Sequence, residues 1–153
     1  MSYESDSTTS RRESREVAVK LLYQWDMTEQ NIADLLESYR TVADAPLVLD
    51  AFCLELVEGT VKEREAIDAE IRRWSTHWSL ERMSTVDRSI LRLALYELLF
   101  RLDIPPKATV NEAIEIAKKF STADSAAFVN GILDQALRAR IEKEVEEETS
   151  PCD

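Results

Sequence analysis

Three arginines lie close together near the start of the chain: Arg11, Arg12 and Arg15. Arg11 and Arg15 are four positions apart and would share one face of a helix, while Arg12 would lie roughly 100° around it. Basic side chains are unfavourable at a helix start, where the backbone dipole is positive, so this concentration favours binding of an anion such as RNA. A simpler interpretation, solvated arginines paired with Glu13 and Glu16, stays open.

A second group of residues with binding chemistry is Phe128 and Asn130, beside Gly131. An aromatic ring with a neighbouring amide can stack on an unpaired base and read its edge. A core position for Phe128 and a close helix contact at Gly131 are the alternatives. Tyr23 falls beside an apolar stripe, where both boundary packing and an interface anchor fit its amphipathic ring.

No group of residues points to catalysis or to a metal. His77 is the only histidine, and one histidine cannot build a multi-histidine metal site. The two glycines cannot form a Gly-rich phosphate loop. Cys53 and Cys152 make neither a disulfide framework nor a metal site. The sequence therefore predicts a protein that is not an enzyme and that uses no cofactor.

The elements that must position these residues are helices. With 153 residues, 44% of them hydrophobic, the chain can bury one core, while two glycines and four prolines are too few for a β-rich fold. Apolar residues recur at three- and four-residue steps, which predicts an all-α bundle of six or seven helices. No apolar run reaches the roughly 20 residues that span a bilayer, and no signal peptide is apparent, so we expect a cytoplasmic protein without membrane contact.

The chain divides into three expected parts: a disordered lead over 1–9, one helical domain over 10–141 and an acidic tail over 142–153. Ser10 and Glu13 have the form of a capping box that would begin the first helix. The tail holds six acidic residues and one lysine, a net charge of −5 out of −11 for the chain. Such acidity argues against a sequence-blind nucleic-acid binder, so anion binding would have to come from a local basic patch.

The most apolar helix is predicted over about 85–102, with Ser84 as its cap. Nearly every face of this segment is apolar, which is typical of a central core helix. Thr109 and Glu112 have the form of a capping box for the next helix. Gly59, inside an earlier helical pattern, either interrupts that helix or allows another helix to approach closely.

Four stretches of the chain carry a family resemblance. Residues 15–25 read REVAVKLLYQW, residues 86–98 read VDRSILRLALYEL, residues 104–120 read IPPKATVNEAIEIAKKF and residues 128–134 read FVNGILD. In this order they resemble the signatures of the NusB family of transcription antitermination factors. The similarity covers about residues 11–136.

The resemblance implies a fold of about seven helices in two packed three-helix subdomains, in agreement with the helical pattern. It also implies a non-enzymatic RNA-binding factor that pairs with the ribosomal protein NusE. Family members bind the boxA element of ribosomal RNA leader transcripts and, in the elongation complex with other Nus factors, help RNA polymerase resist termination.

The resemblance also assigns roles to particular residues. Together with the aromatic–amide pattern, it gives the expected RNA-binding residues as Arg11, Arg12, Arg15, Asp124, Phe128 and Asn130. It implies that Tyr23 and Asp87 meet NusE, with Glu81 near the same surface.

Glu13 and Glu16 interrupt the N-terminal basic run, and the chain is strongly acidic. We therefore expect weak RNA affinity for the isolated chain and strong dependence on a partner, which adds contact surface. NusB-like domains also begin RNA cytosine methyltransferases, but such an enzyme needs a Gly-rich loop and a catalytic cysteine that this chain lacks. A helical interaction module or homodimer that binds no RNA is the remaining alternative.

Overall fold

The computed structural model describes residues 7–41 and 49–149, and these form seven α-helices, one 3-10 helix and no strand. The α-helices are α1 (Ser7–Thr28), α2 (Ile32–Thr41), α3 (Ala51–Lys62), α4 (Arg64–Trp74), α5 (Thr85–Phe100), α6 (Pro106–Phe120) and α7 (Ala123–Thr149), and the 3-10 helix η1 is Leu80–Arg82. The predicted all-α fold is confirmed.

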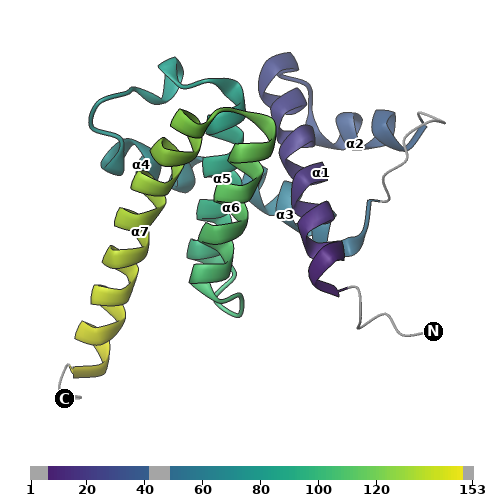
Figure 1. Ribbon diagram of the computed structural model, residues 1–153. Helices are drawn as coiled ribbons and strands as arrows, with labels where there is room; N and C mark the ends of the chain where they lie inside the picture. Colours follow the sequence, from purple (N-terminus) through teal and green to yellow (C-terminus); the bar gives the residue numbers. More distant parts are fainter. Residues whose placement is uncertain (1–6, 42–48, 150–153) are drawn as a thin grey trace.

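The helices form two groups that pack against each other (Figure 1). Helices α1, α2 and α3 make the N-terminal group, and α5, α6 and α7 make the C-terminal group, with α4 against α5 and α7. Helix α5 belongs to both, because it also packs on α1 and α3. This is the arrangement of two three-helix subdomains that the family resemblance implies.

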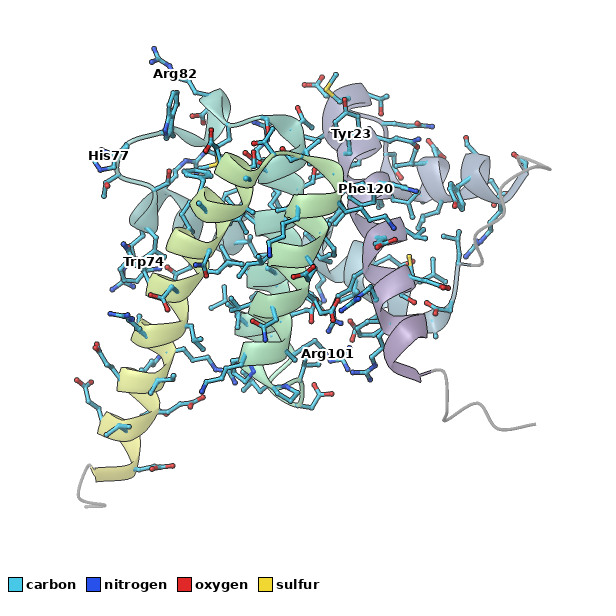
Figure 2. All side chains as sticks on the ribbon, viewed as in Figure 1. Tyr23, Trp74, His77, Arg82, Arg101 and Phe120 are labelled. Carbon is cyan, nitrogen blue, oxygen red and sulfur yellow. The ribbon has the colours of Figure 1, made fainter. Side chains whose placement is uncertain are left out.

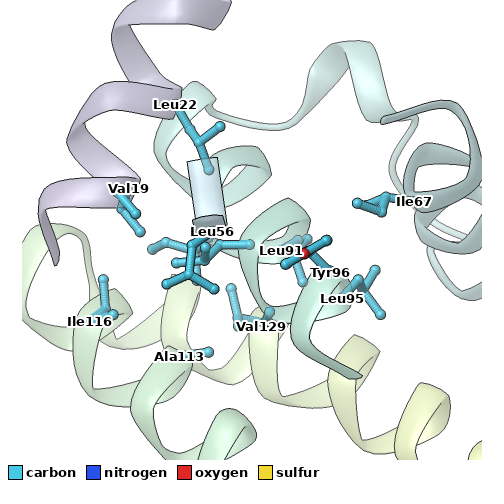
Figure 3. Close-up of a cluster of buried hydrophobic side chains, with 14 of the residues drawn as sticks. Val19, Leu22, Leu56, Ile67, Leu91, Leu95, Tyr96, Ala113, Ile116 and Val129 are labelled. Carbon is cyan, nitrogen blue, oxygen red and sulfur yellow. The ribbon is translucent and has the colours of Figure 1, made fainter. Parts of the chain in front are cut away.

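Helix α5 is the centre of the hydrophobic core. Every residue from Ser89 to Leu98 is buried, although Arg92 and Glu97 are charged. Figure 3 shows Leu91 and Leu95 of this helix in the buried cluster with side chains from α1, α3, α4, α6 and α7. The expectation of a central helix that is buried on all faces is confirmed, and α1, α3, α4, α6 and α7 all pack on it.

Gly59 lies inside α3, where this helix packs on α5. A β-carbon at this position would overlap the ring of Tyr96. The glycine therefore permits close approach of the two helices and does not interrupt α3. The interruption comes later, at Glu63, where α3 ends and α4 begins.

The predicted cap of α5 is confirmed, because Ser84 Oγ accepts a hydrogen bond of 3.1 Å from the backbone N–H of Asp87. The cap expected at Ser10 is wrong, since α1 already begins at Ser7. Of the expected N-terminal lead, residues 7–9 belong to α1 and residues 1–6 lie outside the described residues.

The helix boundary expected at Thr109 is also wrong. Helix α6 begins at Pro106, where the ring's fixed φ suits a first turn and no N–H is needed. Thr109 is consequently inside the helix, and its Oγ1 donates to Glu97 at 3.0 Å.

The segment expected as an acidic tail continues α7 through Thr149, while residues 150–153 lie outside the described residues. The second half of α7 extends beyond the other helices (Figure 1). Its residues from Ile141 to Glu148 are all exposed.

Candidate nucleic-acid interface

Of the three N-terminal arginines, Arg15 is not on the surface: it is only 6% exposed. Its Nε and Nη2 donate to the two carboxylate oxygens of Glu97 at 2.9 and 2.7 Å. The same carboxylate accepts a hydrogen bond from the hydroxyl of Thr109. Arg15 thus differs from Arg11 and Arg12 in being buried, and its Nε and Nη2 bind a carboxylate that joins α1 to α5 and α6.

Arg12 is exposed and reaches from α1 to α6. Its Nε and Nη2 donate to the carboxylate of Glu112 at 2.8 and 2.9 Å. These hydrogen bonds stabilise both charged forms, lowering the pKa of Glu112 and raising the pKa of Arg12. The exposed guanidinium of Arg12 is thus held by a carboxylate of α6.

Arg11 is exposed, and its guanidinium lies 4.6 Å from the centroid of the Phe52 ring. Arg15 and Arg101 approach the same ring at 5.4 and 5.6 Å. Figure 2 places Arg101 near the lower ends of α1 and α6, and because Arg101 shares the Phe52 ring with Arg11 and Arg15, the N-terminal arginines lie there too; we call this the lower end of the molecule, although α7 extends further down. At this end of the molecule the guanidinium of Arg11 packs on the ring of Phe52, and the guanidinium of Arg12 is paired with the carboxylate of Glu112.

A second candidate surface is a cavity of about 280 Å³ where η1, α5 and α7 meet. We call it the Trp78 cavity, and the residues that give it its chemistry are Trp78, Arg82, Asp87, Asp124 and Phe128. It brings together two residues expected to bind RNA, Asp124 and Phe128, and one expected to bind the partner, Asp87. The ring of Phe128 is half-buried, and Asp124 is exposed.

Asp87 is largely buried beside this cavity, at 8% exposure. Its Oδ2 accepts a hydrogen bond of 3.1 Å from Ser125, while its Oδ1 has no hydrogen-bond partner within the described part of the chain. A buried carboxylate oxygen without a donor is costly. Asp87 therefore favours a ligand group that donates a hydrogen bond at the Trp78 cavity.

The sequence interpretation missed Trp78 and Arg82. Trp78 is 54% exposed, and Arg82 projects at the upper end of the molecule in Figure 2. The signal that could have found them is an aromatic residue followed at four positions by an arginine in a polar loop, since aromatic and basic residues interleave in nucleic-acid sites.

Asn130 does not join Asp124 and Phe128, the other two predicted RNA-binding residues of α7, at the Trp78 cavity. It is exposed on α7 but does not line the Trp78 cavity. Two residues along a helix are roughly 200° apart, so Asn130 and Phe128 point to different faces.

The expected partner-binding residues are on different elements. Tyr23 is 38% exposed near the end of α1. Glu81 is exposed on η1, where a backbone hydrogen bond and Arg72, 3.3 Å away, lower the pKa of its carboxyl. Tyr23 and Glu81 are thus open to a partner protein, whereas Asp87 is largely buried and lines the Trp78 cavity.

A larger cavity, of about 520 Å³, has four arginines and four carboxylates among its lining residues. Arg88 donates to Asp26 at 2.7 Å, and Arg92 binds Asp68 with contacts of 2.9 and 3.0 Å. These pairs join α1, α4 and α5, so the two arginines act within the fold.

Within the described part of the chain, no three His, Cys, Asp or Glu side chains are grouped so that they could hold a metal ion. Burial raises the pKa of the Cys53 thiol to about 12, so this side chain stays protonated near neutral pH. None of the described helices is both long enough and apolar enough to cross a membrane.

Comparison with known proteins gives a consistent result. Residues 12–138 match the NusB family. The chain is 46% identical over 144 residues to the transcription antitermination protein NusB of Citrifermentans bemidjiense, covering 89% of this chain and 99% of that protein. It is 48% identical over 127 residues to NusB of Geobacter sulfurreducens, covering 82% and 92%.

Solved structures of NusB are also similar to this chain. NusB of T. maritima matches with a TM-score of 0.72 and 40% identity, over 84% of this chain and 90% of that chain. A chain in the crystal structure of antitermination factors NusB and NusE in complex with dsRNA matches with a TM-score of 0.75 and 28% identity, over 86% and 98%.

Proposed function

Because the chain belongs to the NusB family, we propose that it is an RNA-binding transcription antitermination factor. Together with NusE it binds boxA-type RNA of ribosomal RNA leader transcripts and helps RNA polymerase, with other Nus factors, to resist termination. The observation that carries the proposal is the likeness, over nearly its whole length, to a chain from the complex of NusB and NusE with dsRNA. The role requires no catalytic step and places the protein beside the polymerase in the cytoplasm.

At the lower end of the molecule, Arg11 and Arg12 are the proposed phosphate contacts. Both are exposed, and each is held on a neighbouring side chain that keeps its guanidinium at the surface. Arg15 has a supporting role, because its buried bond to Glu97 fixes the helix turn that carries the other two arginines.

At the upper end, the Trp78 cavity is the proposed site for an unpaired base. Trp78 and Phe128 supply aromatic faces, and Arg82 supplies a cation for the attached phosphate. The unpartnered Oδ1 of Asp87 suits the exocyclic amine of a base. Asp124 lies at the exposed rim of the cavity, and Asn130 lies outside it.

Tyr23 and Glu81 are the proposed NusE contacts, with Asp87 between this surface and the RNA. A chain of net charge −11 attracts RNA poorly by itself. Association with NusE adds contact surface for the same RNA, so the pair should bind far more tightly than this chain alone.

The test is fluorescence anisotropy with labelled boxA RNA and a scrambled control, without and with NusE. We expect a boxA preference that strengthens with NusE. Arg11→Ala and Arg12→Ala should each reduce the slope of log affinity against log salt by about 0.7. Trp78→Ala should weaken binding by about 1–3 kcal/mol.

Arg138→Ala is the matched control, because Arg138 is exposed on α7 in an ion pair with Asp134 and lies outside both surfaces. It should leave affinity and salt slope unchanged. Equal binding of boxA and scrambled RNA, in both conditions, would contradict the proposal and leave a helical interaction module as the better description.

A further inference from the structure

The two proposed RNA-binding surfaces lie at opposite ends of the molecule. In Figure 2, Arg101 marks the lower end, near the start of α1, and Arg82 marks the upper end, near the start of α7. A single RNA strand that touches both ends has to cross the surface between them. The side chains along that surface therefore decide whether the two ends belong to one continuous site.

Helix α1 carries a stripe of polar residues that faces α6. Arg12, Glu16 and Lys20 recur at four-residue steps, which places them on one face of the helix. From Arg12 to Lys20 this face rises about 12 Å. Three residues further on is Tyr23, at the upper end of the molecule (Figure 2).

Each residue of the stripe meets a side chain of α6. Arg12 pairs with Glu112 at 2.8 Å, and Glu16 accepts from Lys119 at 3.0 and 3.1 Å. Lys20 Nζ lies 5.5 Å from the ring centroid of Phe120. We call this row of six residues the α1–α6 seam.

The upper part of the seam combines an aromatic ring with two cations from different helices. Lys119 Nζ lies 5.7 Å from the Phe120 centroid, so the ring is close to both ammonium groups. Phe120 is half-buried, whereas Lys20 and Lys119 are exposed. Figure 2 shows Phe120 between α6 and α1.

We propose that Lys20, Phe120 and Lys119 bind a nucleotide of an RNA strand that runs along the α1–α6 seam, from the N-terminal arginines towards the Trp78 cavity. The inference rests on the proposed function and adds a contact site to it. The ring supplies a stacking face for a base, and the two ammonium groups supply phosphate contacts on either side of it.

The two carboxylates of the seam are partners for two of its cations in the absence of RNA. Glu112 and Glu16 each hold a cation of the opposite helix while no RNA is bound. The cations of these two pairs are more than half exposed, and ion pairs at a protein surface are weak because water competes for the charges, so a phosphate can replace a carboxylate as the partner of the cation. Lys20 forms no ion pair with any of the described residues, and its ammonium is open to a phosphate.

The experiment measures anisotropy of boxA RNA with the NusE complex across a salt series. Lys20→Ala with Lys119→Ala should lower the salt slope by roughly 1 to 1.5 units, since two phosphate contacts are lost. Phe120→Leu should weaken binding at least about fivefold with an unchanged slope, because only stacking is lost. Lys118→Ala is the matched control: Lys118 and Lys119 have the same side-chain exposure, 59%.

A gain-of-binding variant excludes a merely structural role. Glu16→Gln releases Lys119 and should tighten RNA binding about two- to fivefold. Glu144→Gln removes an equal charge and an equal ion pair, with Arg140, from the far half of α7, and should change affinity little. Thermal unfolding of each variant checks that the fold is retained.

The seam contacts are overturned if the double lysine variant keeps the parent's affinity and salt slope while Arg12→Ala and Trp78→Ala lose binding. In that outcome the proposed function stands. A parent protein that does not prefer boxA even with NusE defeats the proposed function itself. Lysine variants that weaken NusE binding and leave RNA binding intact also overturn the inference, because they assign the seam to the protein partner.

Discussion

Arg15 and Glu97 are 82 positions apart in the sequence and form a two-pronged ion pair inside the protein, with N···O distances of 2.9 and 2.7 Å. Their side chains are only 7% and 1% exposed. The pair joins α1 to α5, and Thr109 joins α6 to the same carboxylate. The start of α1, which carries the two exposed arginines, is thereby fixed against the centre of the fold.

Arg15→Ala should destabilise the protein by about 3–5 kcal/mol, because it leaves the Glu97 carboxylate buried without its counterion. The double variant Arg15→Leu with Glu97→Leu should lose less stability than Arg15→Ala, since neither charge then remains buried. Urea unfolding followed by circular dichroism measures both. A single variant as stable as the parent would show that the pair does not hold α1 in place.

Arg15→Ala should not change the salt slope of RNA binding at temperatures where the variant is folded, in contrast to Arg11→Ala. A buried guanidinium bound to a carboxylate releases no counterions when RNA binds. Anisotropy across a salt series compares the two variants. A slope that falls equally in both would mean that Arg15 leaves Glu97 to contact RNA.

Glu112→Gln should tighten RNA binding, because the carboxylate that holds Arg12 at 2.8 Å is removed and the guanidinium becomes available to a phosphate. An exposed pair of this kind is worth up to about 1 kcal/mol, so the gain should be no more than about fivefold. Glu144→Gln serves again as the charge-matched control. Weaker binding by Glu112→Gln would indicate that Glu112 orients Arg12 for RNA.

Gly59→Ala should destabilise the protein. Alanine favours a helix by about 1 kcal/mol over glycine, but overlap with the Tyr96 ring costs about 1–3 kcal/mol. The ring cannot move freely, because it is buried and stacked on Phe100. Gly131→Ala is the control: apart from the chain neighbours and the backbone of the same helix, no atom lies within 4 Å of the added carbon, so this variant should be stabilised. In chemical unfolding, the free energy of unfolding should fall in Gly59→Ala and rise in Gly131→Ala.

Asp103 should contribute stability that disappears in acid. The hydrogen bonds from Arg101 lower the pKa of Asp103 from 3.8 to about 2. The lowered pKa stabilises the folded state fully above pH 3.8, and this contribution is lost as the pH falls towards 2. The Tm difference between the parent and Asp103→Asn should therefore be constant from pH 7 to 4 and shrink below it. A difference that does not depend on pH would exclude the ion pair as its cause.

Much of the fold could be predicted from local patterns. The three- and four-residue spacing of apolar residues predicts the helices. The segment after Ser84 is apolar on nearly every face, which predicts the central helix, because the residues of a helix determine which of its faces can be buried. Boundaries at Ser10 and Thr109 were missed, since a capping motif can also occur inside a helix whose start is set by neighbouring contacts.

The sequence by itself determined the helical class, the central position of α5, the family and the types of residue that can contact RNA. The tertiary structure alone decided which of those residues are available. It buries Arg15 against Glu97, joins Trp78 to Phe128 in one cavity and aligns Lys20 with Phe120. Local sequence encodes the period of a helix, whereas these contacts depend on how helices far apart in the chain pack together.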